Sequence, residues 1–199
     1  MKAAGKRLVV KVGTSTLTYE NGQRNIRRIE ELCRVLSDLH NAGYEVILVS
    51  SGAIGVGMGK LRLSERPEET EKKQAIAAVG QCELMFLYDK LFGEYDCIVA
   101  QMLLTADDVA SETSRTNIQN TLEELLCMGV IPVVNENDTV GINELVGHNF
   151  GDNDTLSAVV ATLAGADRLA ILTDIDGLYD GDPRKNPSAR RIPVVREIT

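Results

Sequence analysis

This sequence of 199 residues has no excess of basic side chains, no long apolar run, and no cluster of cysteine or histidine residues. The formal net charge of −8 argues against non-specific binding to nucleic acid or to an anionic membrane, because both partners need a basic surface. An anionic substrate stays compatible with this charge, since one lysine can dominate inside a cleft. No stretch approaches the roughly 20 apolar residues that span a bilayer. The apolar run at 8–10 is too short for the core of a signal peptide.

The cysteines and histidines are too scattered to indicate a disulfide framework, a metal site or a nucleophilic centre. No two cysteines form a CxxC pair, so we expect buried free thiols in a reducing compartment and therefore a cytoplasmic protein. Neither His40 nor His148 belongs to a pattern that suggests a nucleophile. The cysteines are Cys33, Cys82, Cys97 and Cys127.

Two familiar ligand-binding signatures are also absent from the sequence. No GxxxxGK[ST] segment occurs, which excludes a Walker A phosphate loop. The acidic stretches that begin at Asp152 and Asp174 both fail the D-x-[DN]-x-[DN]-G pattern of an EF-hand. No dedicated metal site built from protein ligands is therefore predicted.

What the sequence does contain is an alternation of short apolar runs and longer amphipathic stretches. With 44% hydrophobic and 25% charged residues, the composition is close to the globular average, so a folded domain with a real core is expected. The apolar runs are almost continuous, which is typical of parallel strands covered on both faces. These predicted strands lie at 8–12, 46–50, 97–103, 130–134 and 169–172.

Apolar residues at helical spacing lie between the predicted strands and predict helices at 26–41, 74–92 and 114–128, of which the first should end at Gly43 and the third at Gly129. A fourth helix should begin near Asn153 or Asp154 and end at Gly165. Strand and helix in repetition predict an α/β sandwich with right-handed crossovers. The charged, proline-containing stretch 61–73 is predicted to be a surface loop, and 139–150 fits either a hairpin or a loop.

Two near-identical acidic clusters mark the place where a ligand is most expected. Asn-Glu-Asn-Asp at 135–138 follows a predicted buried strand, and Gly-Asp-Asn-Asp at 151–154 leads into a predicted helix. Strand carboxyl ends and helix amino ends both project groups into a cleft. Helix capping alone would need only one polar residue, so three in a row favour a site that binds a small polar ligand.

Glycine-rich turns follow the first two predicted strands. Lys11 lies inside an apolar strand and is followed by Gly13, and a buried ammonium needs a partner, so contact with a phosphate is favoured over a lysine that extends to water. The turn at 50–57 fits ligand contact and close helix packing equally well. The turn-rich stretch 172–183 contains Tyr179, whose ring could lie against a base or against the core.

Taken in order, a series of motifs resembles the amino-acid kinase family over nearly the whole chain. The last motif is shared across that family, whereas the pair at 135–138 and 151–154 is more selective and resembles the branch that phosphorylates glutamate. The motifs lie at 11–14, 50–54, 77–81, 100–105, 120–122, 131–138, 150–158 and 172–179.

The resemblance implies a three-layer αβα sandwich with a mainly parallel open sheet. It also implies transfer of a phosphoryl group from ATP to the side-chain carboxylate of L-glutamate, the first step of proline biosynthesis. Phosphoryl transfer needs positioning and positive charge rather than a protein nucleophile, which agrees with the residues present. The resemblance further implies a homo-oligomer and proline as a feedback inhibitor.

The resemblance also implies a role for particular residues. Lys11 would neutralise the transferring phosphoryl group, and Asp154 would order the surroundings of that lysine. Gly13 would present a backbone amide to the phosphates, as would Gly52. Mg²⁺ would be carried mainly on the phosphates of ATP. The glutamate would be held by Ser51, Gly52, Asp138 and Asn153, and the nucleotide would lie near Thr173 and Asp174.

Members of the family continue past the equivalent of Thr199 with a segment that carries a second catalytic lysine, and many add a PUA domain. Residues 1–199 are therefore interpreted as an amino-acid kinase domain that stops before its C-terminal nucleotide-site segment and has no PUA domain. Two alternatives stay open. One is another member of the family that acts on aspartate or a nucleotide, and the other is a module that senses glutamate or proline without catalysis.

Overall fold

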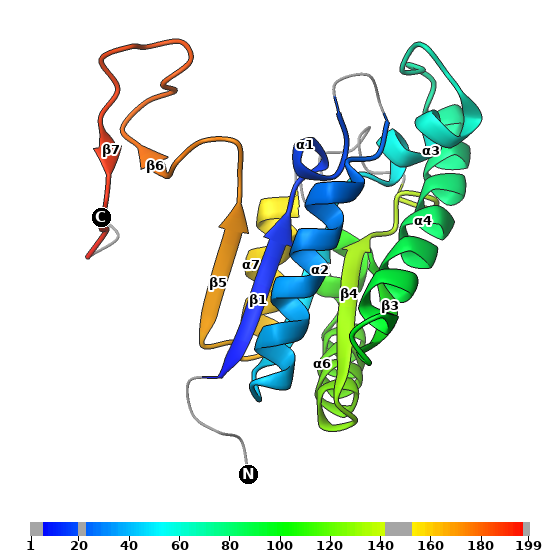
Figure 1. Ribbon diagram of the computed structural model, residues 1–199, viewed down its shortest axis with the longest axis vertical. Helices are drawn as coiled ribbons and strands as arrows, with labels where there is room; N and C mark the ends of the chain where they lie inside the picture. Colours follow the sequence, from blue (N-terminus) through cyan, green and yellow to red (C-terminus); the bar gives the residue numbers. More distant parts are fainter. Residues whose placement is uncertain (1–5, 20–22, 142–152, 197–199) are drawn as a thin grey trace.

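A computed structural model describes residues 6–19, 23–141 and 153–196. The main sheet has parallel strands in the order β3-β4-β2-β1-β5 (Figure 1). These strands are β1 Arg7–Val12, β2 Glu45–Ser50, β3 Ile98–Leu104, β4 Val130–Glu136 and β5 Arg168–Leu172. After β5, the short strands β6 Leu178–Tyr179 and β7 Arg191–Ile192 pair with each other in an antiparallel sheet of their own.

Helices connect the strands of the main sheet. The three longest have 16 to 24 residues and a fourth has 11, whereas the remaining described helices are shorter and begin just after the end of a strand. The described helices are α1 Thr14–Leu17, α2 Ile26–Asn41, α3 Ala53–Leu61, α4 Thr70–Gly93, α5 Ala106–Ala110, α6 Glu112–Cys127 and α7 Asn153–Leu163.

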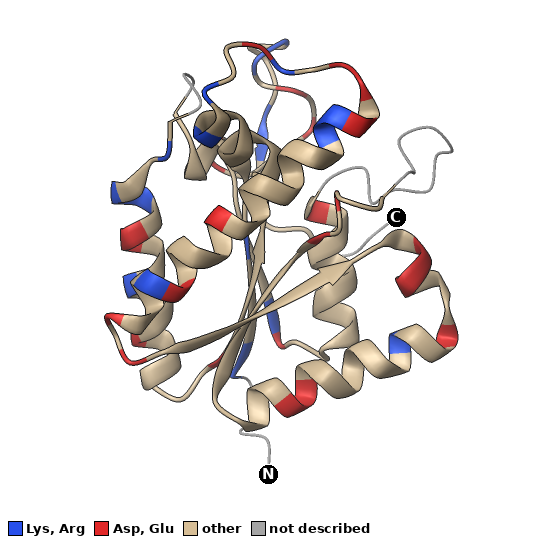
Figure 2. Cartoon of the chain, turned by 90° about the vertical axis from the view of Figure 1, so that its right-hand side faces the viewer, with Lys and Arg blue, Asp and Glu red and all other residues tan. Residues whose placement is uncertain are grey.

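Apolar side chains alternate between the two faces of the sheet, and each face has its own core. Val10 and Leu48 pack with residues of α2 and α4, whereas their neighbours Val9 and Ile47 pack with residues of α6 and α7. Acidic and basic residues lie mostly on the helices and loops around this core (Figure 2). The predicted three-layer αβα sandwich with a parallel sheet is thus confirmed.

Helices α3 and α4 lie closer together than side chains normally permit, because a glycine stands at each contact. A Cβ atom at Gly57 would lie 2.1 Å from the carbonyl oxygen of Ile76, and one at Gly80 would lie 1.7 Å from that of Ala53. Both obstacles are backbone atoms, so no side-chain rotation could relieve the clash. The glycines therefore fix α4 against the start of α3, directly after β2.

The opposite end of the sheet is held by a buried arginine at the start of β1. Arg7 is 3% exposed, and its Nε donates to Glu45 at 2.6 Å. Its Nη1 donates to Glu123 at 2.8 Å and to the carbonyl oxygen of Ala164 at 2.6 Å. Burial lowers the pKa of the Arg7 guanidinium, but the hydrogen bonds with Glu123 and Glu45 outweigh this and raise it. Arg7 thus joins β1 to β2, to α6 and to the segment after α7.

All the predicted strands and helices are present, with small shifts at their ends. Residues 26–41 form α2 as predicted. The glycines predicted to end helices have positive φ angles of 85° at Gly43, 72° at Gly129 and 56° at Gly165. Such left-handed backbone is the usual helix stop, and glycine adopts it without strain.

Several sequence predictions are wrong in detail. The edge strands are not covered on both faces, since Ile98 in β3 is 66% exposed and Ile171 in β5 is 41% exposed. The predicted loop 61–73 is too long, because α4 begins at Thr70. Helix α3 was not predicted, since its glycines lower helix propensity. Residues 142–150 of the predicted hairpin or loop lie outside the described residues.

The cysteines are free, as predicted, but only two of them are buried. Cys33 and Cys97 lie in the core, whereas Cys82 and Cys127 are exposed on α4 and at the end of α6. The prediction of burial fails for this second pair because helical context does not say which face a residue takes. Among the described helices, none is both long enough and apolar enough to cross a membrane.

Candidate active site

The sequence-predicted site residues gather where strands β1, β2 and β4 end. Parallel strands expose their carboxyl ends at one edge of the sheet, and ligands of α/β proteins bind outside that edge. Helix α3 begins after Gly52 at the end of β2, and α7 begins at Asn153. Residues far apart in the sequence thus meet at one place.

Lys11 forms an ion pair with Asp154, as its position in an apolar strand required. Its Nζ lies 2.5 Å from Oδ1 of Asp154, and the lysine side chain is only 12% exposed. The ammonium thus has a partner within the protein, and contact of Lys11 with a phosphate stays a prediction. A Cβ atom at Gly13 would lie 3.5 Å from Nζ, so the glycine leaves the ammonium accessible from the backbone side.

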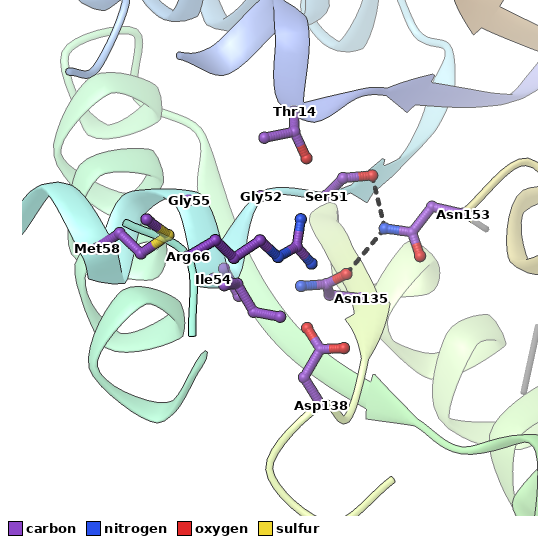
Figure 3. A pocket seen from close by; sticks show the side chains of 11 residues that line it. Thr14, Ser51, Gly52, Ile54, Gly55, Met58, Arg66, Asn135, Asp138 and Asn153 are labelled. Carbon is purple, nitrogen blue, oxygen red and sulfur yellow. Dashed lines mark hydrogen bonds between the residues drawn. The ribbon is translucent and has the colours of Figure 1, made fainter. Parts of the chain in front are cut away.

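A pocket of about 440 Å³ is lined by Asn153, the residue before Asp154, and by Thr14 after the end of β1, whereas Lys11 and Asp154 themselves do not line it. All four of the predicted substrate residues line it, and Figure 3 shows the side chains of Ser51, Asp138 and Asn153 around a common space, with Gly52 in the backbone beside them. Polar groups dominate one wall, while Ile54 and Met58 supply the apolar part. The lining residues are Thr14, Ser51, Gly52, Ala53, Ile54, Gly55, Met58, Arg66, Asn135, Asp138 and Asn153.

A chain of side-chain amides supports the pocket wall. Nδ2 of Asn153 lies 2.8 Å from the carbonyl oxygen of Ser50, 2.6 Å from Oγ of Ser51 and 3.1 Å from Oδ1 of Asn135 (Figure 3). Asn135 is 2% exposed, and its Nδ2 donates to Oε1 of Gln81 at 2.9 Å. The amides therefore connect α4, β4, β2 and α7 at the bottom of the pocket.

Behind β2, the phenol of Tyr88 contacts the strand end from α4. Its hydroxyl lies 2.8 Å from Oγ of Ser50. Burial raises the pKa of Tyr88, so the phenol stays neutral. Its hydrogen bond with Ser50 connects α4 to the end of β2.

Arg66 brings a positive charge to the pocket from the loop between α3 and α4. It also lines a neighbouring pocket of about 500 Å³, which shares Gly55 and Met58 with the first. Among the described residues, no carboxylate forms an ion pair with Arg66. Arg66 therefore lies between two neighbouring pockets, and Arg62 adds a second basic side chain to the lining of the larger one.

Thr173 and Asp174, predicted to lie at a nucleotide, are not part of this pocket. They follow β5 and are exposed. A backbone hydrogen bond lowers the pKa of Asp174, as does Arg184, whose Nη2 lies 2.6 Å from Oδ2. Tyr179 belongs to neither core cluster, and its hydroxyl donates to Asp176 at 2.5 Å. Asp152 and His148 lie outside the described residues.

Three residues of this region were missed as site candidates by reasoning from the sequence. Asn135 was recognised as part of an acidic cluster, but only its burial in the structure indicates that it orients neighbouring side chains. Gln81 belongs to a recognised motif to which no role was given. Arg66 lies in a stretch taken for a plain surface loop, and nothing in its local sequence indicates a pocket.

Comparison with known proteins defines the class of protein. Residues 6–198 match the amino acid kinase family, and the chain belongs to that family. It is 60% identical over 195 residues to glutamate 5-kinase of Clostridium perfringens, covering 98% of this chain and 72% of that protein. Glutamate 5-kinase of Listeria welshimeri is 56% identical, with 98% and 71% covered. Glutamate 5-kinase of Clostridium acetobutylicum is 55% identical, with 96% and 71% covered.

Proposed function

We propose that this protein is a glutamate 5-kinase, which transfers a phosphoryl group from ATP to the side-chain carboxylate of L-glutamate in proline biosynthesis. Family membership and the identity of 56–60% to enzymes of that name support this function. The observation that carries it is the ion pair of Lys11 and Asp154 beside a pocket containing Asp138 and Asn153. A buried lysine next to a polar pocket suits charge neutralisation near a small polar substrate.

The pocket offers complementary charges for a zwitterionic amino acid. In our proposal, the ammonium of glutamate lies near Asp138 and Asn153, and its α-carboxylate lies toward Arg66. The side-chain carboxylate then lies toward Ser51 and Gly52, on the side of Lys11. A charged group gains most from such partners where water is largely excluded.

The proposed chemistry needs no protein nucleophile. An oxygen of the glutamate side-chain carboxylate attacks the γ-phosphorus of ATP, the bond from that phosphorus to the bridging oxygen breaks, and ADP leaves. Lys11 offsets negative charge on the transferring group, and Asp154 holds the lysine in place. The described residues contain no group of three or more His, Cys, Asp or Glu side chains that could hold a metal ion. Mg²⁺ is proposed to bind mainly through the ATP phosphates, as it commonly does in kinases.

The test is formation of an acyl phosphate, trapped as a hydroxamate by hydroxylamine. The natural full-length protein should give glutamyl hydroxamate with ATP, Mg²⁺ and glutamate. Lys11→Met should lower kcat by about 10²–10³-fold, the usual cost of removing one group that stabilises a transition state. Lys72→Met is the matched control, since this lysine is exposed and forms an ion pair with Glu69 at the start of α4. No hydroxamate from the full-length protein would refute the function.

Substrate competition separates this function from its rivals. Aspartate and a nucleoside monophosphate should be poor acceptors, and a preference for either would assign the protein to a different branch of the family. Calorimetry that detects glutamate or proline but no ATP analogue would favour a sensing module instead.

We also propose that proline inhibits by competing with glutamate, because it presents the same ammonium and carboxylate to Asp138 and Arg66. Inhibition that glutamate cannot overcome would contradict this. A homo-oligomer is proposed as well, since Phe86 on α4 and Ile98 on the adjoining strand β3 are 62% and 66% exposed. Sedimentation of a monomer at micromolar concentration would contradict that proposal.

A further inference from the structure

Gln81 lies on α4 and is 7% exposed, at the inner end of the amide chain below the pocket. It does not line the pocket, and the proposed chemistry does not use it. A buried polar side chain needs hydrogen-bond partners, so its presence in a largely apolar helix face calls for an explanation. Its partner is the amide of Asn135, at 2.9 Å.

The orientation of this amide chain is fixed by backbone groups at two points. The carbonyl oxygen of Ser50 can only accept, so the amide end of Asn153 that faces it must be the nitrogen. The N–H of Glu136 can only donate, so the end of Asn135 that it contacts at 2.9 Å must be the oxygen. The nitrogen of Asn135 consequently points to α4, where the oxygen of Gln81 receives it.

The helix contact described above places Gln81 at the required distance. Gly80 lets α4 approach the start of α3 so closely that a Cβ atom would lie 1.7 Å from the carbonyl oxygen of Ala53. The next residue, Gln81, then reaches the end of β4. Gly80 and Gln81 thus act together, one through its missing side chain and the other through its amide.

We propose that Gln81 is a positioning residue that makes the pocket selective for a substrate with a free ammonium group. Together with the N–H of Glu136, the acceptor oxygen of Gln81 keeps the oxygen of Asn135 directed at the nitrogen of Asn153. That nitrogen also contacts Ser50 and Ser51, so the carbonyl oxygen of Asn153 is the atom available to accept a hydrogen bond from a ligand. Next to Asp138, this makes an acceptor-rich wall suited to an ammonium.

Loss of the Gln81 acceptor leaves a buried donor on Asn135 without a partner. Rotation of the Asn135 amide would turn that donor away from α4 but would set its nitrogen against two other donors, the N–H of Glu136 and the nitrogen of Asn153. Either outcome disturbs the wall that faces the ammonium. Neither outcome removes the ion pair of Lys11 with Asp154, because neither of these residues takes part in the hydrogen bond between Gln81 and Asn135. This inference deepens the proposed function and rests on it.

The experiment compares glutamate with glutarate, which has both carboxylates but no ammonium. In Gln81→Met, the KM for glutamate should rise about tenfold, the effect of one lost buried hydrogen bond. Inhibition by glutarate, the KM for ATP and kcat should change less than about twofold, a change of under 0.5 kcal/mol. Gln81→Glu keeps an acceptor oxygen at the same reach and should restore most of the preference for glutamate.

Leu84→Ala is the control for general destabilisation, since Leu84 lies on the same helix and is 1% exposed but takes no part in the amide chain. It should lower thermal stability without changing the ratio of glutamate to glutarate affinity. Equal weakening of glutamate and glutarate in Gln81→Met, or the same pattern in Leu84→Ala, would overturn the proposal. If the wild-type protein makes no glutamyl phosphate, the proposed function fails. Calorimetry with glutamate and glutarate then tests Gln81 separately by the same ratio.

Discussion

Replacing Gly80 by alanine tests the close contact of α3 and α4 directly. The added Cβ atom would lie 1.7 Å from the carbonyl oxygen of Ala53 and 2.6 Å from the backbone nitrogen of Gly57. Ordinary contact of a Cβ atom begins at 3.4 Å, so the first distance must double. Only movement of one helix away from the other can achieve this, because both obstacles belong to backbone.

The expected cost follows from two opposing effects. Overpacking typically costs up to about 3 kcal/mol, and the upper end applies because no flexible side chain can yield. Alanine in place of glycine inside a helix returns about 1 kcal/mol through better helix propensity. Gly80→Ala should therefore lose about 2 kcal/mol of stability, which is about 4–8 °C in Tm for a domain of this size.

The assay is thermal and urea unfolding followed by circular dichroism, with Gly93→Ala as the matched control. Gly93 lies at the end of the same helix, and a Cβ atom there would meet nothing within 4 Å. Gly93→Ala should leave Tm unchanged or raise it slightly. Gly80→Ala should also weaken glutamate binding, because α3 begins at the pocket. Equal Tm values for the two variants would refute the reasoning about the helix contact.

Further predictions concern ion pairs and thiols. Arg7→Ala should lower the free energy of unfolding by about 2 kcal/mol, because it removes charge-assisted hydrogen bonds to Glu45 and Glu123, whose side chains are themselves partly exposed. Urea unfolding should show no such loss for Arg34→Ala, whose pair with Asp38 is exposed. The hydrogen bond from Lys60 lowers the pKa of Glu83 below its ordinary value of 4.5, so the associated stability is present above that pH and is lost as pH falls through the lowered pKa. The stability difference between the wild-type protein and Glu83→Gln should accordingly shrink on acidification in urea titrations, and a growing difference would contradict this assignment. Burial raises the pKa of Cys33 to about 12, so its thiol should react slowly. Alkylation of the native protein followed by mass spectrometry should label the exposed Cys82 and Cys127 and spare Cys33 and Cys97. Early labelling of the second pair would contradict their burial.

Much of the fold could be predicted from the sequence because its elements are encoded locally. Continuous apolar runs indicated the strands, and glycine after an amphipathic stretch marked helix ends such as Gly43 and Gly129. Helix α3 was not predicted because its glycines allow the close contact with α4, and this contact depends on residues that are distant in the sequence. Packing there outweighs intrinsic propensity.

The candidate site was predictable where a residue is unusual in its own segment. Lys11 in an apolar strand and Asp138 after a buried strand are of this kind. Asn135 and Gln81 are 54 positions apart, and Arg66 lies in a loop without a pattern. Their association depends on how strand ends and helices meet in space, and no local periodicity carries that information.

The amide chain from Gln81 through Asn135 to Asn153 crosses from one core of the molecule to the other. Helix α4 packs in the core on one face of the sheet, and α7 packs in the core on the opposite face. A ligand that binds Asn153 is therefore connected to the cores on both faces of the sheet. Hydrogen exchange of backbone amides in α4 and α7 should slow together when glutamate binds, and the two helices should open as one cooperative unit.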